Sequence, residues 1–320
     1  MSPSSGGKRV LVTGGAGFLG SHVCRRLVED GHTVVAVDNT ATGTAGNLTA
    51  LFSRPNFRFV QCDVLEYQPD GRFDQIFHMA SPASPSEYRR LALETIRVNT
   101  LGTERALQWA RDMDADVLYT STSEAYGDPL VSPQEESYRG NVNTWGPRAC
   151  YDESKRLGET YCYEYHVTFG VRVRVVRIFN TYSAGLRVND GRVISNFVSQ
   201  ALRGEPITVY GDGSQTRSFC YVDDTVEALV RVMNSPQCIG EIVNIGNPDE
   251  HTILEIAQMV KALTGSASEI VFLPPPKDDP VRRRPSIEKI KRLVGWEPKI
   301  SLEEGLRRTI EEYRRKLDIA

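Results

Sequence analysis

The chain has 320 residues, of which 40% are hydrophobic and 25% are charged, and its formal net charge is −3. This length suits one large α/β domain with an attached lobe, or two unequal domains. A slightly acidic chain is not attracted to nucleic acid or to anionic membranes by its net charge, so neither is expected as a partner. No apolar run approaches the ~20 residues that a membrane-spanning helix needs.

The cysteines and histidines show no pattern typical of a metal site. Six cysteines are scattered without a CxxC pair, and five histidines are equally dispersed. We therefore expect buried, reduced thiols in a reducing compartment and no bound metal. Residues 1–8 are polar and glycine-rich and lack the apolar stretch of a signal peptide, which predicts a disordered tail on a cytoplasmic protein.

Short β-branched runs alternate with helical patterns through the first half of the chain. The expected strands are Arg9–Thr13, Thr33–Val37, Phe57–Gln61, Gln75–Met79, Val117–Thr120 and Arg172–Ile178. The helical patterns between them cover Leu19–Asp30, Ser86–Met113 and Ser154–Phe169. Because parallel neighbours need a crossover connection, this alternation predicts an α/β fold with a doubly wound parallel sheet, the Rossmann architecture.

The composition of the sequence changes after Asn180. Glycine, proline and polar residues separate shorter elements, and Pro274–Pro280 is expected to form a stiff connector. Two further helical patterns follow the change, at Ile253–Leu263 and Leu302–Arg314. We predict a Rossmann domain at 8–180 and a smaller C-terminal lobe at 181–320, with an interleaved boundary because the second part returns at least one element to the sheet.

Three glycines stand between the first strand and the first helix. Gly14, Gly17 and Gly20 form a GxxGxxG, in which glycine permits a tight turn and a close approach of the backbone to a pyrophosphate at the helix N-terminus. Asp38 ends the second strand, where a carboxylate accepts both ribose hydroxyls and repels a 2′-phosphate. The first domain is therefore predicted to bind NAD and to disfavour NADP.

Other cofactor contacts are expected at the ends of the next strands. Asp63 follows the third strand and is placed either to meet the adenine or to cap a turn. Ala80 and Ser81 close the fourth strand, where the cofactor crosses the carboxyl edge of the sheet. The complete predicted set is Gly14, Gly17, Phe18, Leu19, Gly20, Asp38, Asn39, Asp63, Val64, Ala80, Ser81, Asn99, Tyr151 and Lys155.

A candidate catalytic group combines a strand end with a helix start. Tyr151 and Lys155 are four residues apart in a helical pattern and so face the same side, although a surface pair has the same spacing. Thr122 and Glu124 end the fifth strand, where open α/β sheets bind ligands. A tyrosine that removes a proton from a sugar hydroxyl needs its pKa lowered from about 10 to about 7, which requires roughly 4 kcal/mol. A neighbouring lysine ammonium and a positive nicotinamide ring both favour the phenolate form.

Motifs along most of the chain resemble the UDP-glucuronate decarboxylase family, within the extended short-chain dehydrogenase/reductase superfamily. They are GGAGFLG, STSEAYGDP, YDESK, RIFNTY, DGRVISNF, GEPITVYGDGSQTRSF, VNIGNP and DDPVRRRPSI…LVGWEP. The resemblance implies NAD-dependent conversion of UDP-glucuronate to UDP-xylose through a 4-keto intermediate, with the hydride returned to C4. It also implies that the lobe at 181–320 mainly binds the nucleotide sugar.

The residues after the fifth strand distinguish this family from relatives that share its fold. Dehydratases resemble T-D-E there and epimerases generally lack the glutamate, whereas this chain has Thr122-Ser123-Glu124. A C4 ketone lies β to the C6 carboxylate, so carbon dioxide leaves without an acid at position 123. Glu124 either positions a water and helps to protonate C5, or is a salt-bridged residue of purely structural role.

The resemblance also implies a set of substrate contacts, in which arginine forks match a diphosphate and an aromatic ring flanks uracil. The set is Pro82, Ser84, Tyr88, Arg97, Glu124, Asn180, Arg192, Val193, Thr208, Tyr210, Arg217 and Arg283. Which arginine of 282–284 points inward is left open by the sequence. Ser183-Ala184-Gly185 replaces the usual Gly-Pro-Arg, and Glu94 stands where a lysine is common.

The sequence leaves two questions open, namely the oligomeric state and the activity within the superfamily. The resemblance implies a homodimer joined by helices around 90–112 and 152–168, although the extra apolar positions there equally fit a buried core. The alternative activities are those of a UDP-sugar 4-epimerase or a 4,6-dehydratase. A catalytically idle NAD-binding protein is a third possibility, and the Tyr151/Lys155 pair argues against it, because a sensor needs no base.

Overall fold

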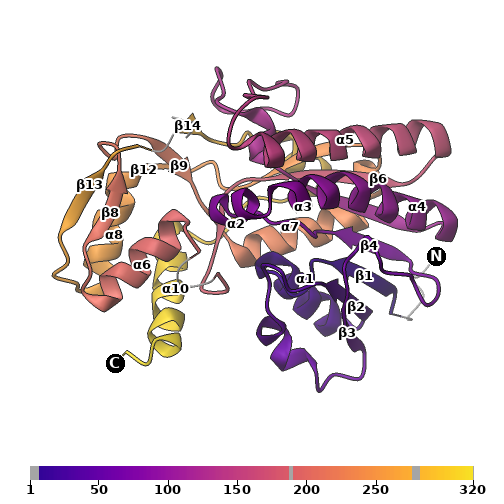
Figure 1. Ribbon diagram of the computed structural model, residues 1–320, viewed down its shortest axis with the longest axis horizontal. Helices are drawn as coiled ribbons and strands as arrows, with labels where there is room; N and C mark the ends of the chain where they lie inside the picture. Colours follow the sequence, from indigo (N-terminus) through magenta and orange to yellow (C-terminus); the bar gives the residue numbers. More distant parts are fainter. Residues whose placement is uncertain (1–6, 187–189, 276–281, 320) are drawn as a thin grey trace.

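The computed structural model describes residues 7–186, 190–275 and 282–319. It consists of a body built on a large sheet and a smaller lobe beside it, drawn on the left of Figure 1. Most of the predicted N-terminal tail, residues 1–6, lies outside the described residues. The same holds for most of the predicted connector, of which residues 276–280 are not described.

A seven-stranded, fully parallel sheet forms the body, in the order β3-β2-β1-β4-β5-β6-β11. The strands are β1 (Arg9–Thr13), β2 (Thr33–Asp38), β3 (Phe57–Gln61), β4 (Gln75–His78), β5 (Asp116–Thr122), β6 (Val173–Ile178) and β11 (Ile242–Ile245). The doubly wound parallel sheet predicted from the sequence is confirmed. The order reverses between β1 and β4, which opens a crevice at the carboxyl edge of the sheet.

Helices cover both faces of this sheet (Figure 1). The helices α1 (Phe18–Glu29) and α7 (Val222–Asn234) lie together on one face, and α4 (Thr103–Met113) and α5 (Ala149–Phe169) lie together on the other. Strand β1 shows why its sequence is apolar throughout. Val10 and Val12 pack in one core and Leu11 packs in the other, because successive side chains point to opposite faces.

The single helix predicted at Ser86–Met113 is wrong. The chain instead forms α2 (Pro85–Arg90), α3 (Ala92–Arg97), one π-helical turn at Val98–Gly102, and then α4. Leu91 leaves the helical region with φ −115° and ψ 45°. Three threonine hydroxyls in this segment bond the carbonyl four residues earlier, an arrangement that bends helices. These residues are Thr95, Thr100 and Thr103.

The lobe carries its own small sheets and helices. It contains α6 (Val193–Arg203), α8 (Ile253–Thr264), α10 (Leu302–Lys316), the pair β8 (Ile207–Tyr210) and β13 (Ile270–Leu273), and the three strands β12 (Glu250–Thr252), β9 (Thr216–Ser218) and β14 (Arg282–Arg283). Other short elements are the pair β7 (Thr181–Tyr182) and β10 (Cys220–Tyr221), α9 (Glu288–Val294), and helical turns at Ala45–Leu51, Ser123–Tyr126 and Pro236–Cys238.

The second part of the chain contributes to the body as well as to the lobe. Strand β11 pairs in parallel with β6 and α7 packs against α1, so the sheet is completed by residues far beyond 180. The division at residue 180 therefore stays a prediction. Within the described ranges, no helix combines the length and the apolar character that crossing a membrane requires.

Candidate active site

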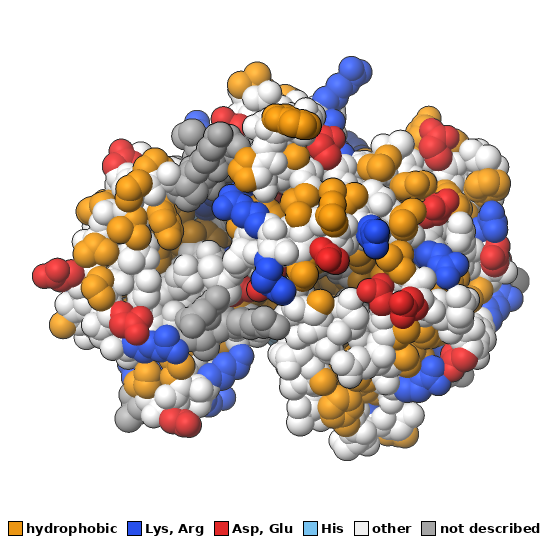
Figure 2. All heavy atoms as spheres, viewed as in Figure 1, with side chains coloured by type: hydrophobic (Ala, Val, Ile, Leu, Met, Phe, Trp, Pro, Cys, Tyr) orange, Lys and Arg blue, Asp and Glu red, His pale blue; other side chains and the backbone are white. Residues whose placement is uncertain are grey.

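A cavity of about 930 Å³ lies between the carboxyl edge of the sheet and the lobe. In Figure 2 the surface is hollowed between the lobe and the body. The predicted site residues that line it are Gly14, Gly17, Phe18, Leu19, Gly20, Asp38, Asn39, Asp63, Val64, Ala80, Ser81, Pro82, Ser84, Tyr88, Arg97, Thr122, Glu124, Tyr151, Lys155, Asn180, Arg192, Val193, Thr208, Tyr210, Arg217 and Arg283. Asn99 does not line the cavity: it is fully buried and its Nδ2 donates to Ser154 Oγ at 3.0 Å.

The glycine-rich turn between β1 and α1 leaves no space for side chains. Gly14 has φ +71°, its N–H donates to Val37 O at 2.7 Å, and a Cβ on it would lie 2.7 Å from Ala80 N. A Cβ on Gly20 would lie 2.1 Å from Gly14 O. No side chain caps the start of α1 at Gly17, so this turn presents free backbone N–H groups to the cavity, where an anion is favoured.

Asp38 joins the end of β2 to this turn. One of its carboxylate oxygens accepts from Ala16 N at 3.0 Å and the other accepts from Thr40 N at 2.7 Å. Burial raises the pKa of Asp38, and these backbone donors lower it. The carboxylate lines the cavity beside the glycine turn, which is the position where a ribose accepts or donates hydrogen bonds.

Asp63 caps the turn after β3 and also lines the cavity. Its Oδ1 accepts from Leu65 N at 2.9 Å, which caps the turn after β3, and its Oδ2 accepts from Asn39 Nδ2 at 2.9 Å. Asp63 and Asn39 also line the cavity. The turn cap therefore does not exclude contact with an adenine.

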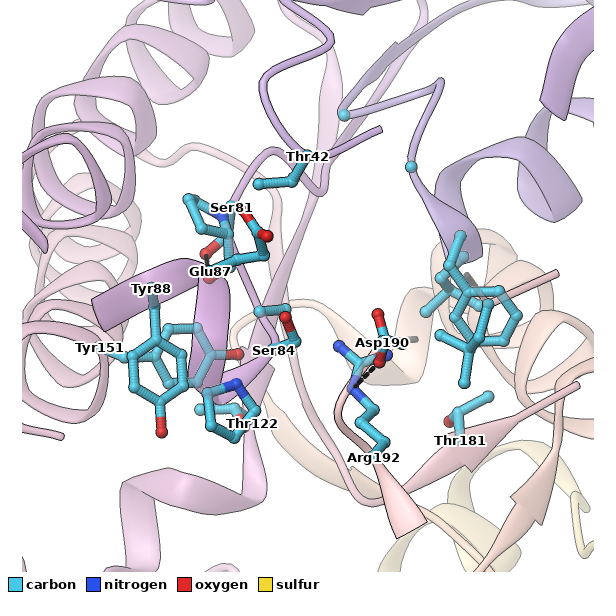
Figure 3. Close-up of a pocket in the computed structure, with 18 of the residues that line it drawn as sticks. Thr42, Ser81, Ser84, Glu87, Tyr88, Thr122, Tyr151, Thr181, Asp190 and Arg192 are labelled. Carbon is cyan, nitrogen blue, oxygen red and sulfur yellow. Dashed lines mark hydrogen bonds and ion pairs between the residues drawn. The ribbon is translucent and has the colours of Figure 1, made fainter. Parts of the chain in front are cut away.

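Tyr151, near the start of α5, is stacked on Tyr88. The ring centroids are 4.9 Å apart and the rings are 7° from parallel. Figure 3 labels both residues. Burial raises the pKa of Tyr151 to about 12, and a hydrogen bond with Thr122 opposes this rise. Thr122 is the last residue of β5, so the strand end brings its hydroxyl to the tyrosine.

Lys155 lies one turn further along α5. Its Nζ donates to Thr120 O at 2.7 Å and lies 6.0 Å from the centroid of the Tyr151 ring. Burial lowers the pKa of Lys155 to about 7. The sequence argument required Lys155 to lower the pKa of Tyr151, but in the protein alone that pKa stands above its usual 10. A role of Tyr151 as a base would therefore require bound ligands to lower its pKa.

Glu124 is held by two arginines. Arg148 donates to its Oε2 and Arg283 donates to its Oε1. Burial alone would raise the pKa of Glu124, but the charges of Arg283 and Arg148 outweigh it and hold that pKa at about 2. In the protein alone, Glu124 is therefore ionised near neutral pH.

The structure answers which arginine of 282–284 points inward. Arg283 is 3% exposed, lines the cavity and also donates to Gly127 O at 2.9 Å. Arg282 is exposed and pairs with Glu250, and Arg284 donates to Pro248 O. Arg283 is thus the member of the triplet that reaches the site.

The remaining predicted substrate residues line the lobe side of the cavity. Arg192 stands before α6 and pairs with Asp190 at 3.2 Å (Figure 3). Arg217 on β9 is buried and in register with Arg283 on the neighbouring strand β14. Tyr210 at the end of β8 is 44% exposed, which leaves its ring accessible to a flat ligand.

Thr208 and Asn180 are engaged with neighbouring groups in the same wall. Thr208 Oγ1 accepts from Gln200 Nε2 at 2.9 Å, and Asn180 Nδ2 donates to Ser218 O at 3.5 Å. Arg97, at the end of α3, is exposed at the opposite rim, as is Glu94. The departure from the family pattern at 94 therefore lies at an exposed position that lines the cavity.

The unusual segment Ser183-Ala184-Gly185 packs against the start of α1. Ser183 Oγ accepts from Gly185 N at 3.1 Å. A Cβ on Gly185 would lie 2.8 Å from His22 Nε2 and 2.9 Å from the Phe18 ring. A larger residue at 185 therefore requires a different packing of Phe18 and His22.

Three cationic side chains of the cavity wall were not predicted from the sequence, namely Arg89, Arg148 and Lys316. Arg148 stands three residues before Tyr151, a helical spacing that could have signalled it. Lys316 ends α10 and donates to Ala184 O, a contact between residues 132 apart in the chain that no local pattern signals. Among the described residues no cluster of three or more potential metal-ligating side chains is present.

Comparison with known proteins identifies the family. Residues 10–246 match the NAD dependent epimerase/dehydratase family. The chain belongs to this family. UDP-glucuronic acid decarboxylase 1 of Danio rerio is 54% identical to this protein, over 97% of this chain and 74% of its own length.

Solved structures of the family share the fold along nearly the whole chain. The UDP-glucose 4-epimerase of Thermotoga maritima superposes with a TM-score of 0.88 at 31% identity, over 97% of this chain and 99% of that one. The UDP-glucuronic acid 4-epimerase of Bacillus cereus, in complex with UDP-glucuronic acid and NAD, superposes with a TM-score of 0.85 at 28% identity over the same shares.

NAD is the cofactor of the enzyme, as the sequence predicted. The residues present fit it: the first-turn N–H groups of α1, at Phe18, Leu19 and Gly20, have no partner within the helix and line the cavity where a pyrophosphate would bind. A Cβ at Gly14 or Gly20 would close the turn before them. Asp38 lines the cavity at the end of β2, where a carboxylate would accept the ribose hydroxyls and disfavour a 2′-phosphate.

Proposed function

We propose that the enzyme converts UDP-glucuronate to UDP-xylose and carbon dioxide. The observation that carries this proposal is the group Thr122, Tyr151 and Lys155 beside one ionised carboxylate, Glu124. Position 123, between Thr122 and Glu124, holds a buried serine and therefore no acid for a departing hydroxide. The 54% identity to a UDP-glucuronic acid decarboxylase supports the same activity.

Each catalytic side chain has a separate task. NAD, when bound, would supply a reversible acceptor for the C4 hydrogen of the sugar. Tyr151 removes the proton of the C4 hydroxyl, and Thr122 hydrogen-bonds the same oxygen while it is a ketone. Lys155 holds the ribose next to the nicotinamide and stabilises the phenolate. Glu124 orients a water near C5.

The decarboxylation itself needs an electron sink and not an acid. Once C4 is a ketone, the C6 carboxylate is β to a carbonyl group, and the bond between C5 and C6 breaks. Its electron pair is delocalised into the C4 carbonyl as an enolate. A proton from solvent then adds to C5, and Tyr151 returns its proton to the C4 oxygen as the hydride returns.

Binding of the nucleotide sugar is assigned to the lobe. Arg192 and Arg217 are the proposed contacts of the diphosphate, and Tyr210 is the proposed neighbour of uracil. Pro82, Ser84 and Tyr88 form the proposed wall beside the sugar. Arg283, which donates a hydrogen bond to Glu124, is proposed to lie between the bound sugar and the lobe.

The test is product identification with the purified enzyme and UDP-glucuronate. We expect carbon dioxide and UDP-xylose, with no net consumption of NAD. UDP-galacturonate without carbon dioxide would make the enzyme a 4-epimerase. A 4-keto-6-deoxy sugar from a nucleotide-linked glucose would make it a dehydratase. Binding of NAD without any turnover would leave a non-catalytic protein.

We further propose that the enzyme is a homodimer joined through α3 and α5, which lie side by side. Figure 2 shows hydrophobic side chains gathered over these helices. The exposed ones include Leu93, Ile96, Leu157, Tyr163 and Val167. Light scattering after size-exclusion chromatography is expected to give twice the chain mass, and Leu93→Asp is expected to give the monomer. A monomeric unaltered protein would contradict the proposal.

A cytoplasmic location is proposed on the state of the thiols. All six cysteines are free and four of them are buried, which suits a reducing compartment. Fractionation of the producing cells is expected to find the protein with cytosolic markers, and recovery with the secreted fraction would contradict this location.

A further inference from the structure

Arg148 is a cavity residue to which neither the motifs nor the proposed mechanism gives a task. It stands directly before α5, one helical turn ahead of Tyr151, and its side chain is only 12% exposed. Its guanidinium donates to Glu124 Oε2, and its Nε lies 3.9 Å from Asp152 Oδ2. One buried guanidinium therefore lies between two buried carboxylates.

The carboxylate of Glu124 is fixed from two different parts of the fold. Arg283 reaches its Oε1 from β14 of the lobe, and Arg148 reaches its Oε2 from the start of α5. The backbone N–H of Glu124 donates to Thr122 Oγ1 at 3.2 Å, and Thr122 hydrogen-bonds Tyr151. Each arginine thus holds one oxygen of a carboxylate that is tied through Thr122 to the catalytic tyrosine.

The two carboxylates beside Arg148 differ in charge. The guanidiniums of Arg283 and Arg148 overcome burial and hold the pKa of Glu124 at about 2. Burial, followed by the charge of Glu124, raises the pKa of Asp152 to about 7. Near neutral pH, Glu124 is fully ionised and Asp152 is partly protonated. Arg148 therefore interacts mainly with Glu124.

We propose that Arg148 is a positioning residue for the decarboxylation: it fixes the Glu124 carboxylate toward the sugar and affects the reaction only through Glu124. The inference rests on the proposed function. Arg148 makes no capping hydrogen bond to α5, and its contact with that helix is the 3.9 Å ion pair with Asp152, whereas its hydrogen bond goes to Glu124. Its planar guanidinium reaches Glu124 and Asp152 from one position, a geometry that a lysine ammonium does not reproduce.

The physical reason for such a residue lies in the task of Glu124. A carboxylate that holds a water beside C5 must keep one orientation and one charge, since a group that rotates or takes up a proton no longer holds the water in place. With Arg148 removed, one oxygen of Glu124 loses its donor while Arg283 still holds the other. We expect a carboxylate that is present but less ordered and more easily protonated.

A double-mutant cycle with Arg148→Gln and Glu124→Gln tests whether Arg148 acts through Glu124. Arg148→Gln is expected to lower kcat by about tenfold or more while KM for UDP-glucuronate changes by less than about threefold. The double variant is expected to be no slower than Glu124→Gln alone. Arg148→Lys should recover part of the loss. Glu153→Gln, an outward-facing charge on the same turn, is the matched control and should leave kcat unchanged.

Other outcomes of this cycle overturn the inference. An unchanged kcat in Arg148→Gln removes Arg148 from the reaction. Losses that multiply in the double variant, or a large rise of KM with kcat intact, make Arg148 a contact of the substrate itself. Circular dichroism and the melting temperature of each variant identify any that has lost its fold, and Arg148→Lys then serves in place of Arg148→Gln.

Infrared titration of the ligand-free protein gives a readout that does not depend on turnover. The groups that face Glu124 are Arg148, Arg283, Asp152, Tyr151 and Tyr88. In Arg148→Gln we expect a carboxylic acid band that appears at higher pH than in the unaltered protein and is absent from the double variant. A titration of Glu124 that does not move would overturn the inference. If the unaltered enzyme makes no UDP-xylose, the proposed function fails while this titration still tests Arg148.

Discussion

Burial sets the resting charge of the catalytic pair. Out of water, the pKa of Tyr151 rises to about 12 and the pKa of Lys155 falls to about 7, so the tyrosine and most of the lysine are neutral just above neutral pH. The spacing of Tyr151 and Lys155 predicted their shared face, but only the fold shows how completely both are enclosed. The sequence predicted a charged ammonium at Lys155, but in the protein alone burial lowers the pKa of this amine to about 7.

Tyr151→Phe tests the base. The substitution keeps the ring that stacks on Tyr88 and removes the hydroxyl that exchanges a proton with the sugar. We expect kcat to fall by a factor on the order of 10²–10⁴, the usual size of a general-base contribution, while UDP binding is retained. Steady-state kinetics and calorimetric titration with UDP measure both effects. Tyr161→Phe on the same helix is the control, and equal turnover of the two variants would remove Tyr151 from the mechanism.

Lys155→Met tests how much the buried amine of Lys155 lowers the stability of the fold. The pKa of Lys155 is about 7 in the folded protein and 10.5 as its ordinary value. The folded state therefore binds fewer protons than the unfolded state between these pH values. This difference lowers the free energy of unfolding by roughly 1.4 kcal/mol for each unit that separates the two pKa values. The full penalty applies at pH values below the folded pKa, and there is no penalty at pH values above the ordinary pKa. We expect the variant to lose turnover. Its stability relative to the unaltered protein should be greatest below the folded pKa and should decline as pH rises toward the ordinary value.

Denaturant unfolding across that pH range measures the difference between the two proteins. The unpaired Thr120 carbonyl, which accepts from Lys155 at 2.7 Å, subtracts a pH-independent amount of about 1–3 kcal/mol from the gain. The pH dependence of the difference is therefore the decisive quantity. A difference that stays constant across the whole range would show that Lys155 is charged in the folded protein.

Asp38→Ala tests cofactor choice. The carboxylate that disfavours a 2′-phosphate also accepts hydrogen bonds from Ala16 N and Thr40 N. We expect the variant to bind NAD more weakly and to narrow the gap between the dissociation constants of NAD and NADP. Asp38→Asn, which keeps the shape and removes the charge, should narrow the gap with a smaller loss of NAD affinity. Fluorescence titration measures these dissociation constants. Equal affinities of the unaltered protein for NAD and NADP would contradict the role of Asp38.

Among the elements, those with a simple period were predictable and those bent by side-chain hydrogen bonds were not. Strands β1 to β6 and α1 lie within two residues of their predicted ends, because β-branched runs and helical spacing are local signals. No range was predicted for β11, the seventh strand of the sheet. The segment from 85 to 113 has helical periodicity throughout, and nothing in that pattern marks the break at Leu91 or the π turn. Helix α5 begins five residues before the predicted Ser154, which places Tyr151 on the helix.

Gly158→Ala tests how α5 is held against the sheet. A Cβ at Gly158 would lie 2.2 Å from the hydroxyl of Tyr119, on β5. We expect α5 to move away from β5 and to carry Tyr151 and Lys155 with it, at a cost of about 1–3 kcal/mol in stability and with reduced kcat. Thermal unfolding and kinetics measure the two effects.

The neighbouring residues provide the controls for this substitution. Thr160→Ala, at an exposed position of the same helix, should change neither quantity appreciably. Tyr119→Phe removes the hydroxyl that the new methyl group meets, so adding it to Gly158→Ala should restore part of the stability. Full stability and turnover in Gly158→Ala alone would contradict the close packing of α5 on β5.

On the scale of the molecule, the site is completed by residues that lie far apart in the chain. Glu124 and Arg283 are 159 residues apart, and Arg283 owes its place to the pairing of β14 with β9, where it stands in register with Arg217. Strand order and the glycine turn follow from patterns in the sequence, so the cofactor half was predictable. The inward turn of Arg283, the contact of Lys316 and the task of Arg148 depend on tertiary packing, which no single segment encodes.

The enclosure of the sugar between sheet and lobe leads to a prediction about isotopes. In the proposed reaction the C4 hydrogen leaves as hydride and returns to the same carbon within one cavity and on one retained cofactor, so we expect it not to exchange with water. The C5 carbanion instead receives a proton from solvent or from a group that exchanges with it. In heavy water we therefore expect UDP-xylose with deuterium at C5 and ordinary hydrogen at C4, and a substrate labelled at C4 should keep its label. Proton NMR of the product reads both positions. Deuterium at C4, or none at C5, would contradict the order of oxidation, decarboxylation and reduction even if carbon dioxide were released.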